Sequence, residues 1–455
     1  MGCPLVNGAA NGRQACRHGA GAGEGPIMQD VRTLFARMAR RPRPLAALCV
    51  GAALALLPPQ PARAGDARDF YSVSSAQLRG RPGTLIRAEP LSPPPGAVAA
   101  YRILYRSRGA RGEPVAVSGV VAAPAPEARR APVVTWGHGT TGIEPGCAPS
   151  RFPRRDFASI SGLGDLLADG VIVVATDYQG LGAGAVHPYL VGASEAHAMI
   201  DAVRAARALP GLGAGTRFAS WGFSEGGQAS LFTGALAARY APELRFEGAA
   251  AVSAPTELRR LLAGDIGTPA GEAVASYAAW SWSRLYHLPL GEVVRPAAVP
   301  TLEHIATLCS LDAPQRLTLG LSTFGYGAAG LLRHGASAVA GLGAPGSGGD
   351  VLDRGPWARL IARNSRPTPR GVPVFLAQGA DDTLVAPSTT RNYARQLCRD
   401  GVRLDYREIA LADHGGAELA SAEPATHWLA ARLAGARPPS DCAALDRHRP
   451  AAARR

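Results

Sequence analysis

The stretch at residues 217–227 constrains the fold more than any other part of the chain. It contains a Gly-x-Ser-x-Gly motif with Ser224 at its centre. A short apolar run typical of a strand precedes the motif, and residues 228–240 after it are typical of a helix. In such a strand–turn–helix the serine occupies a sharp, strained turn, and Gly222 and Gly226 are small enough to let strand and helix pass closely. The pattern therefore predicts a serine hydroxyl raised clear of a sheet, beside the first N–H groups of a helix.

The rest of the chain alternates between short apolar runs and longer helical segments. The predicted strands are residues 101–107, 115–121, 133–136, 171–175, 217–221, 247–253, 372–377 and 402–409, and the predicted helices are 157–167, 194–209, 228–240, 388–398 and 424–433. This alternation predicts an α/β fold with a mostly parallel sheet flanked by helices. Ligands of such sheets bind at the carboxyl ends of the strands.

The alternation fails between residues 255 and 355, and this break suggests the domain organisation. The segment is helical in composition and includes a glycine-rich part at 341–349 and the aromatic residues Tyr277, Trp280, Trp282, Tyr286 and Phe324. We interpret 255–355 as a helical cap or lid inserted between two parts of one core, 65–254 and 356–442. The aromatic rings either pack the cap itself or line an apolar tunnel. Residues 65–96 are proline-rich and predicted to be irregular, and 443–455 are predicted to be a disordered tail.

The first 64 residues have the features of an export signal. Three arginines, Arg40, Arg41 and Arg43, precede an apolar run of 13 residues at 45–57. The run is too short for a transmembrane helix, and Ala62-Arg63-Ala64 fits a small-x-small cleavage site. We therefore expect residues 1–64 to be a leader and signal peptide and the mature protein to be secreted.

The net charge of +13 does not indicate a nucleic-acid partner. All 48 basic residues are arginine, scattered along the chain with no basic stripe carrying interleaved aromatic residues. A mildly basic, solvated surface is the better interpretation.

Four cysteines follow the predicted signal peptide, at Cys147, Cys309, Cys398 and Cys442. An even number in an exported chain suggests disulfides, with three possible pairings. We predict Cys147–Cys309, which would tie the cap to the sheet, and Cys398–Cys442, at the ends of elements expected to pack together. No Cys-x-x-Cys or His-x-x-x-His pattern suggests a metal site.

A serine nucleophile needs a base, and the base needs an acid to orient it. In an α/β sheet with this elbow the chain order is serine, acid, histidine. Asp381 and Asp382 follow the strand at 372–377, and His414 follows the strand at 402–409. His427 is the alternative base, but it lies inside a predicted helix, where a histidine more often serves packing or the surface.

The oxyanion of a tetrahedral intermediate needs N–H donors. One is expected from Glu225, the residue after the nucleophile. The other is expected from the loop at 138–142 after the strand at 133–136, with Thr141 and Gly142 as candidates. We expect His138 to be structural because it precedes the nucleophile.

Several motifs together resemble the secretory lipase family, the fungal lipase A-like branch of the α/β-hydrolases and its bacterial relatives. They are His138-Gly139-Thr140-Thr141-Gly142, Cys147-Ala148-Pro149-Ser150, Thr176-Asp177-Tyr178-Gln179-Gly180-Leu181-Gly182 and His187-Pro188-Tyr189-Leu190-Val191-Gly192. The similarity spans roughly residues 70–442. It implies an α/β-hydrolase fold with a helical cap and no cofactor. The chain departs from the family at Glu225, where a smaller residue is frequent, and in the cap.

The resemblance implies catalytic roles for Ser224, Asp382 and His414, since Asp382 rather than Asp381 matches the family's Asp-x-x-Val spacing. The sequence thus predicts a secreted serine ester hydrolase, a lipase or carboxylesterase that forms an acyl-enzyme. Its partners would be small-molecule or lipid esters, uncharged and of short to medium chain, with transient contact with a lipid interface. The alternatives are a peptidase or amidase on the same fold and a non-catalytic binding module.

Overall fold

The computed structural model describes residues 69–125, 130–184, 186–264, 269–294, 296–309 and 351–447. All of them belong to one compact unit, Asp66–Arg455. The predicted leader, Phe324, the glycine-rich segment 341–349 and residues 448–455 of the predicted tail lie outside the described residues. Among the helices that are described, none is both long enough and apolar enough to cross a membrane.

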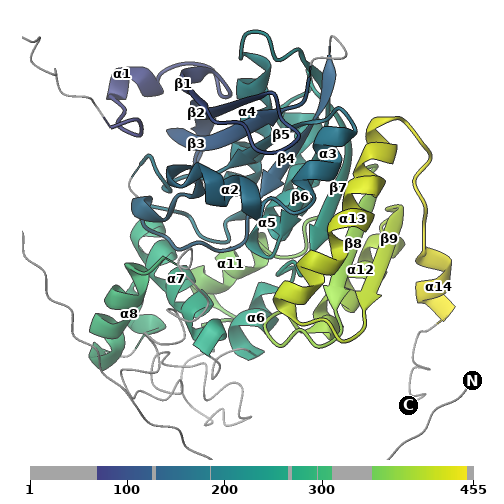
Figure 1. Cartoon of the computed structure of the whole chain (residues 1–455). Coiled ribbons are helices and arrows are strands. Elements are labelled where there is room, and N and C mark those ends of the chain that lie inside the picture. Colours follow the sequence, from purple (N-terminus) through teal and green to yellow (C-terminus); the bar gives the residue numbers. More distant parts are fainter. Residues whose placement is uncertain are drawn as a thin grey trace, which may run out of the picture. The chain divides into compact units, whose positions relative to one another are not determined.

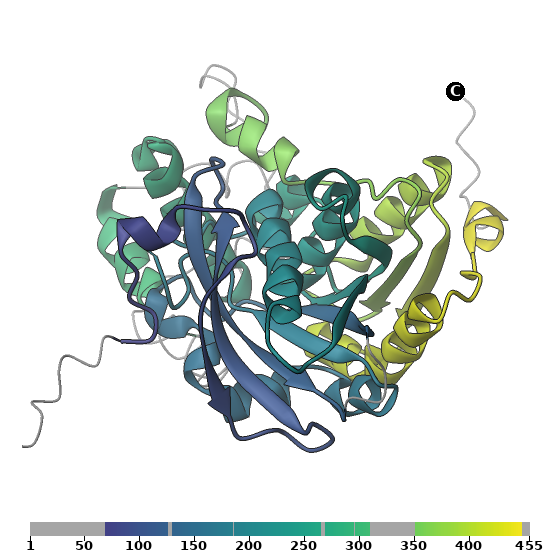
Figure 2. The ribbon, with the colours of Figure 1, turned by 90° about the horizontal axis from the view of Figure 1, so that it is seen from above.

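A nine-stranded sheet forms the centre of this unit, in the order β1-β2-β3-β5-β4-β6-β7-β8-β9 (Figure 1). The strands are β1 Leu85–Leu91, β2 Ala99–Arg108, β3 Pro114–Ala123, β4 Ala131–Gly137, β5 Ile172–Thr176, β6 Ala214–Phe223, β7 Arg245–Val252, β8 Val374–Gly379 and β9 Leu404–Ile409. The six strands β5, β4, β6, β7, β8 and β9 pair in parallel in that order. At one edge, β1 pairs antiparallel with β2, β2 with β3, and β3 with β5. Figure 2 shows the dark blue antiparallel strands at one end of the sheet and the yellow-green β8 and β9 at the other. The predicted fold class is confirmed.

Helices cover both faces of the sheet, and this explains why its central strands are apolar throughout. The helices are α2 Pro153–Ser159, α3 Leu163–Ala168, α4 Gly192–Arg207, α5 Glu225–Tyr240, α12 Pro387–Arg399 and α13 His414–Leu433. Successive side chains of a strand point to opposite faces. In β5, Ile172 and Val174 pack with α4 and α5, whereas Val173 and Ala175 pack with α2, α3 and α13. A strand buried on both faces needs no polar alternation.

The described part of the predicted cap is helical. It comprises α6 Leu258–Gly264, α7 Pro269–Tyr286, η3 Leu290–Glu292, η4 Pro296–Ala298 and α8 Val299–Ala306. Its apolar core includes Tyr277 and Trp282, both 1% exposed, and extends to Ile143 and Val385 of the hydrolase core. The Trp282 indole N–H donates to the Tyr189 carbonyl at 2.7 Å. Tyr277 and Trp282 are therefore buried in packing that joins the cap to the hydrolase core.

Both predicted disulfides are present. Cys147 is bonded to Cys309 and Cys398 to Cys442, so the predicted pairing is confirmed. The first bond links the loop after β4 to the segment just after α8. The second links α12 to the short C-terminal helix α14 Cys442–Arg447.

The segment predicted to be irregular, 65–96, contains the short helix α1 Ser75–Leu78 and the strand β1. The prediction of irregular structure was wrong for this strand, because Pro90 within β1 made the sequence look unlike a strand. Proline cannot donate to a central ladder, but it is tolerated in an edge strand such as β1.

Two helix boundaries were also wrong. The helix predicted at 157–167 is divided into α2 and α3, because Gly162 between them adopts φ 73°. The helix predicted to begin at Pro424 begins ten residues earlier in the chain, at His414, and contains that proline. Asp413 caps its start by accepting a hydrogen bond from the Gly416 amide at 2.7 Å.

Candidate active site

The elbow forms as its sequence predicts, with β6 ending at Phe223 and α5 beginning at Glu225. Ser224 between them adopts φ 53° and ψ −119°, a strained backbone conformation for a residue with a side chain. A Cβ on Gly226 would lie 1.9 Å from the Gly137 carbonyl oxygen, and one on Gly222 would lie 2.1 Å from the Gly226 oxygen. Only glycine at these two positions lets the start of α5 pass so close to β4 and β6.

Ser224, His414 and Asp382 lie in a hydrogen-bonded row. His414 Nε2 is 3.0 Å from Ser224 Oγ, and His414 Nδ1 is 2.8 Å from Asp382 Oδ2. Asp382 sits in the turn after β8, and His414 is the first residue of α13 after β9. Because parallel strands end at the same edge of a sheet, residues 190 positions apart in sequence meet there.

The carboxylate of Asp382 is buried and fully hydrogen-bonded. Its Oδ1 accepts from the amides of Leu384 and Val385, each at 2.9 Å, and Gln378 Nε2 donates to Oδ2 at 2.8 Å. Burial alone would raise the pKa of Asp382, but the hydrogen bond and charge of His414, with the Val385 and Gln378 bonds, outweigh it and lower the pKa below its ordinary value. Asp382 therefore stays ionised beside the imidazole.

The alternative residues lie elsewhere. Asp381 and His427 are exposed. Asp413 also does not face the imidazole, since its carboxylate caps α13. Gln378 was missed by the sequence reasoning. The pattern that could have indicated Gln378 is a polar residue near the end of an otherwise apolar strand, β8.

The loop after β4 packs beside the elbow. Gly139 is close to the ring of Phe223, because a Cβ on this glycine would lie 2.8 Å from Phe223 Cδ1. Gly142 has φ 120°, and a Cβ there would lie 2.6 Å from Cys147 Sγ. Thr141 is buried, and Glu225 is the first residue of α5. The amides of Glu225, Thr141 and Gly142 stay predicted oxyanion donors.

The sheet order, the helical insertion and the elbow define an α/β-hydrolase. The chain matches the family model of the secretory lipases over residues 156–314 and 350–441, and it belongs to that family. By family and fold it is a hydrolase of the lipase type. The predicted family is confirmed.

Two curated relatives cover most of the chain. Lipase A of Arthroderma benhamiae is 25% identical over 396 residues, which are 80% of this chain and 79% of the relative. A "probable inactive lipase" of Mycobacterium tuberculosis is 24% identical over 388 residues, which are 80% of this chain and 82% of the relative.

Two solved structures share the fold. Candida antarctica lipase A superposes with a TM-score of 0.65 at 19% identity, covering 82% of this chain and 87% of its own. The rice cell wall degrading esterase LipA from Xanthomonas oryzae has a TM-score of 0.63 at 21% identity, with 79% of this chain and 100% of its own covered.

Proposed function

We propose that the protein is an exported serine ester hydrolase in which Ser224 is the nucleophile, His414 the base and Asp382 the orienting acid. The observation that carries the proposal is the hydrogen-bonded row of these three side chains, at 3.0 and 2.8 Å. A carboxylate only accepts, so His414 donates Nδ1–H to Asp382. The Nε2 lone pair then faces the Ser224 hydroxyl.

In the proposed reaction, Ser224 Oγ attacks the ester carbonyl carbon while His414 Nε2 takes the hydroxyl proton. The tetrahedral oxyanion accepts N–H bonds from Glu225 and from the Thr141–Gly142 loop. The intermediate collapses as the C–O bond to the alcohol breaks, and His414 returns the proton to the departing alkoxide. Water, activated by the same imidazole, then hydrolyses the acyl-enzyme and releases the acid.

The proposed substrates are uncharged short- to medium-chain esters, including lipids met in transient contact with an interface. The cap core is apolar and reaches Ile143 and Val385 beside the predicted oxyanion loop and the acid turn. Each methylene buried there would contribute about 0.8 kcal/mol. The names of the relatives, lipase and esterase, support the same class. The family description and the two disulfides support export.

One relative is described as a probable inactive lipase, so a protein without catalytic activity, such as a binding module, is the second candidate. The complete row of three side chains weighs against it here, because binding alone needs neither the base nor its orienting acid.

Nitrophenyl esters from acetate to octanoate test the proposal. Ser224→Ala should lower the turnover rate by about 10⁴-fold or more with the fold intact, because the three residues act as a unit. The matched control is Ser159→Ala, an exposed serine of α2. Unchanged turnover in Ser224→Ala would refute the assignment. Turnover of casein at a comparable rate would favour a peptidase, and no turnover of any ester or peptide would favour the binding module.

A further inference from the structure

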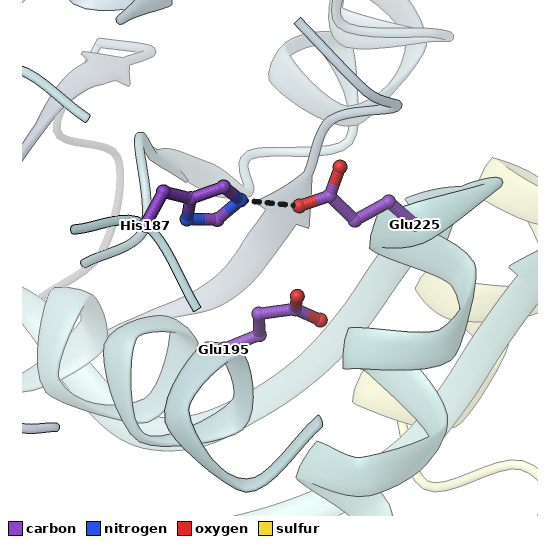
Figure 3. A group of neighbouring side chains, drawn as sticks. All are labelled: His187, Glu195 and Glu225. Atoms are coloured by element: carbon purple, nitrogen blue, oxygen red, sulfur yellow. Dashed lines mark hydrogen bonds and ion pairs between the residues drawn. The ribbon is translucent and has the colours of Figure 1, made fainter. Parts of the chain in front are cut away.

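Three side chains outside the Ser224–His414–Asp382 row meet in the protein interior. His187 and Glu195 are 0% exposed and Glu225 is 1% exposed. One nitrogen or oxygen atom from each lies within 4.8 Å of the other two (Figure 3). His187 comes from the segment before α4, Glu195 from the first turn of α4, and Glu225 from the first position of α5. We call this group the buried His–Glu cluster.

The imidazole of His187 has a defined proton position. Its Nδ1 is 2.8 Å from the Gln179 carbonyl oxygen, which only accepts, so Nδ1 carries the hydrogen. The Nε2 lone pair then lies 2.9 Å from Glu225 Oε1. Two acceptors face each other at this distance only with a proton or a cation between them. A histidine that binds a metal commonly has this arrangement, with its other N–H donated to a backbone carbonyl.

The carboxylates leave three oxygens without a hydrogen-bond partner among the described residues: both oxygens of Glu195 and Oε2 of Glu225. Figure 3 shows the Glu195 carboxylate pointing toward the space between His187 and Glu225. A buried, unpaired carboxylate is costly. A proton on Glu225 can be shared with His187, but a proton on Glu195 has no acceptor at hydrogen-bond distance. A single cation in the space between them can contact all three groups.

We infer that the buried His–Glu cluster is a binding site for one divalent transition-metal ion of the zinc class, held by His187 Nε2 and by the carboxylates of Glu195 and Glu225. Two carboxylates and a neutral imidazole balance the charge of a divalent ion. Nitrogen and carboxylate oxygen together suit Zn²⁺, which binds in many sites to three protein ligands with a water in the fourth position. Ca²⁺ takes six to eight oxygen ligands, and Mg²⁺ keeps several waters, so neither suits a buried site with an imidazole.

The ion would join the start of α5 to the start of α4 and to the segment that carries His187. Two tyrosine rings flank the imidazole, Tyr178 at 6.0 Å and Tyr189 at 6.1 Å between ring centroids. Tyr178 Oη donates to the His138 carbonyl at 3.1 Å, and Tyr189 Oη bonds Thr140 Oγ1 at 2.8 Å. The side chains packed around the cluster thus hold the loop after β4. This structural role does not rest on the proposed function.

Metal analysis of the purified full chain tests the inference. We expect about one zinc-class ion per chain when the protein is produced with Zn²⁺ present, bound as the chain folds because the ligands are buried. Unfolding in the presence of a chelator, followed by refolding, should give a metal-free chain with a lower melting temperature. Refolding with Zn²⁺ should restore the melting temperature, and refolding with Co²⁺ should give the visible absorption of a nitrogen- and oxygen-ligated ion.

Glu195→Gln keeps the shape of the side chain and removes a charged ligand. It should weaken Zn²⁺ binding by at least about 10–100-fold, the loss that even an outer-shell change produces. The matched control is Asp156→Asn, a buried acid outside the cluster that also has an oxygen with no hydrogen-bond partner among the described residues, and it should keep the ion. Only trace metal in the wild-type chain, with equal melting temperatures after refolding with and without Zn²⁺, would overturn the inference. Full metal content in Glu195→Gln would also overturn it. The wild-type measurements decide the matter even if that variant does not fold.

Discussion

Two histidines of the protein each lie within 3.0 Å of a carboxylate. His414 contacts Asp382 and lies beside Ser224, whereas His187 contacts Glu225, the residue after Ser224. The His414 side chain is 20% exposed, whereas that of His187 has no exposed surface. The first site is therefore open to a reactant, and the second is closed to everything except a group bound during folding.

The two sites also differ in how their carboxylates are paired. Both oxygens of Asp382 are hydrogen-bonded, and its pKa is lowered. The Glu195 carboxylate has no hydrogen bond of normal geometry in the described part of the chain; the Leu190 amide interacts with it more weakly. Burial and then the charge of Glu225 raise the pKa of Glu195. A histidine and a carboxylate at hydrogen-bond distance thus do not define a catalytic pair by themselves. Under the two proposals, the partners of the carboxylate distinguish a site that would move a proton from a site that would bind a cation.

Exchanging the acid of the first site should have the largest effect. Asp382→Asn should lower the turnover of nitrophenyl esters by about 10⁴-fold, because an amide facing Nδ1 favours the wrong imidazole tautomer. Asp381→Asn, at the exposed neighbour, is the matched control and should change turnover little. Steady-state kinetics on both variants measures this, and the reverse ranking would assign the acid to Asp381.

Removing the Cys147–Cys309 disulfide, which lies near the predicted oxyanion loop, should have the next largest effect. Replacing Cys147 and Cys309 with serine should destabilise the chain by about 2–5 kcal/mol. It should also lower turnover by about 10–100-fold, because Gly142 of the predicted oxyanion loop packs against Cys147 and a small displacement there is costly.

The matched control is the double serine variant of Cys398 and Cys442, which are 44 residues apart rather than 162. The shorter loop should reduce the loss of stability by about 1 kcal/mol. Turnover per folded molecule should remain. Equal losses of turnover in the two double variants would show that the Cys147–Cys309 bond does not support the site.

The smallest effect concerns pH. The pKa of Asp382 is lower in the folded chain than its ordinary value. Its charged form therefore contributes stability above about pH 4, and this contribution is lost as the pH falls through the lower folded value. Denaturant unfolding should give wild type a higher free energy of unfolding than Asp382→Asn at neutral pH, and this difference should shrink on acidification. A difference in free energy of unfolding that grew on acidification would contradict the lowered pKa of Asp382.

The first site could be predicted from the sequence because each of its residues follows the end of a predicted strand. Ser224, Asp382 and His414 lie in linear motifs, and the parallel sheet brings the ends of those strands together. The start of α13 could not be predicted, since Gly415 and Gly416 have low helix propensity and only the Asp413 cap and packing against the sheet override it. The limits of the cap stay a prediction.

The buried His–Glu cluster could not be predicted, and the sequence suggested no metal site. His187, Glu195 and Glu225 lie in three different segments with no spacing typical of metal ligands. They meet only because α4 and α5 pack together on one face of the sheet. Burial, which gives their unpaired oxygens significance, is a property of that packing and not of any linear pattern.

Labelling with a fluorophosphonate tests the central claim most directly. The reagent should form one adduct per chain, on the peptide that contains Ser224, and esterase activity should fall in proportion to labelling. Prior Asp382→Asn substitution should slow the reaction, because the activated nucleophile depends on the oriented base. Peptide mapping by mass spectrometry identifies the modified residue. An adduct on another serine, or full ester turnover in a chain whose Ser224 is completely labelled, would contradict the account.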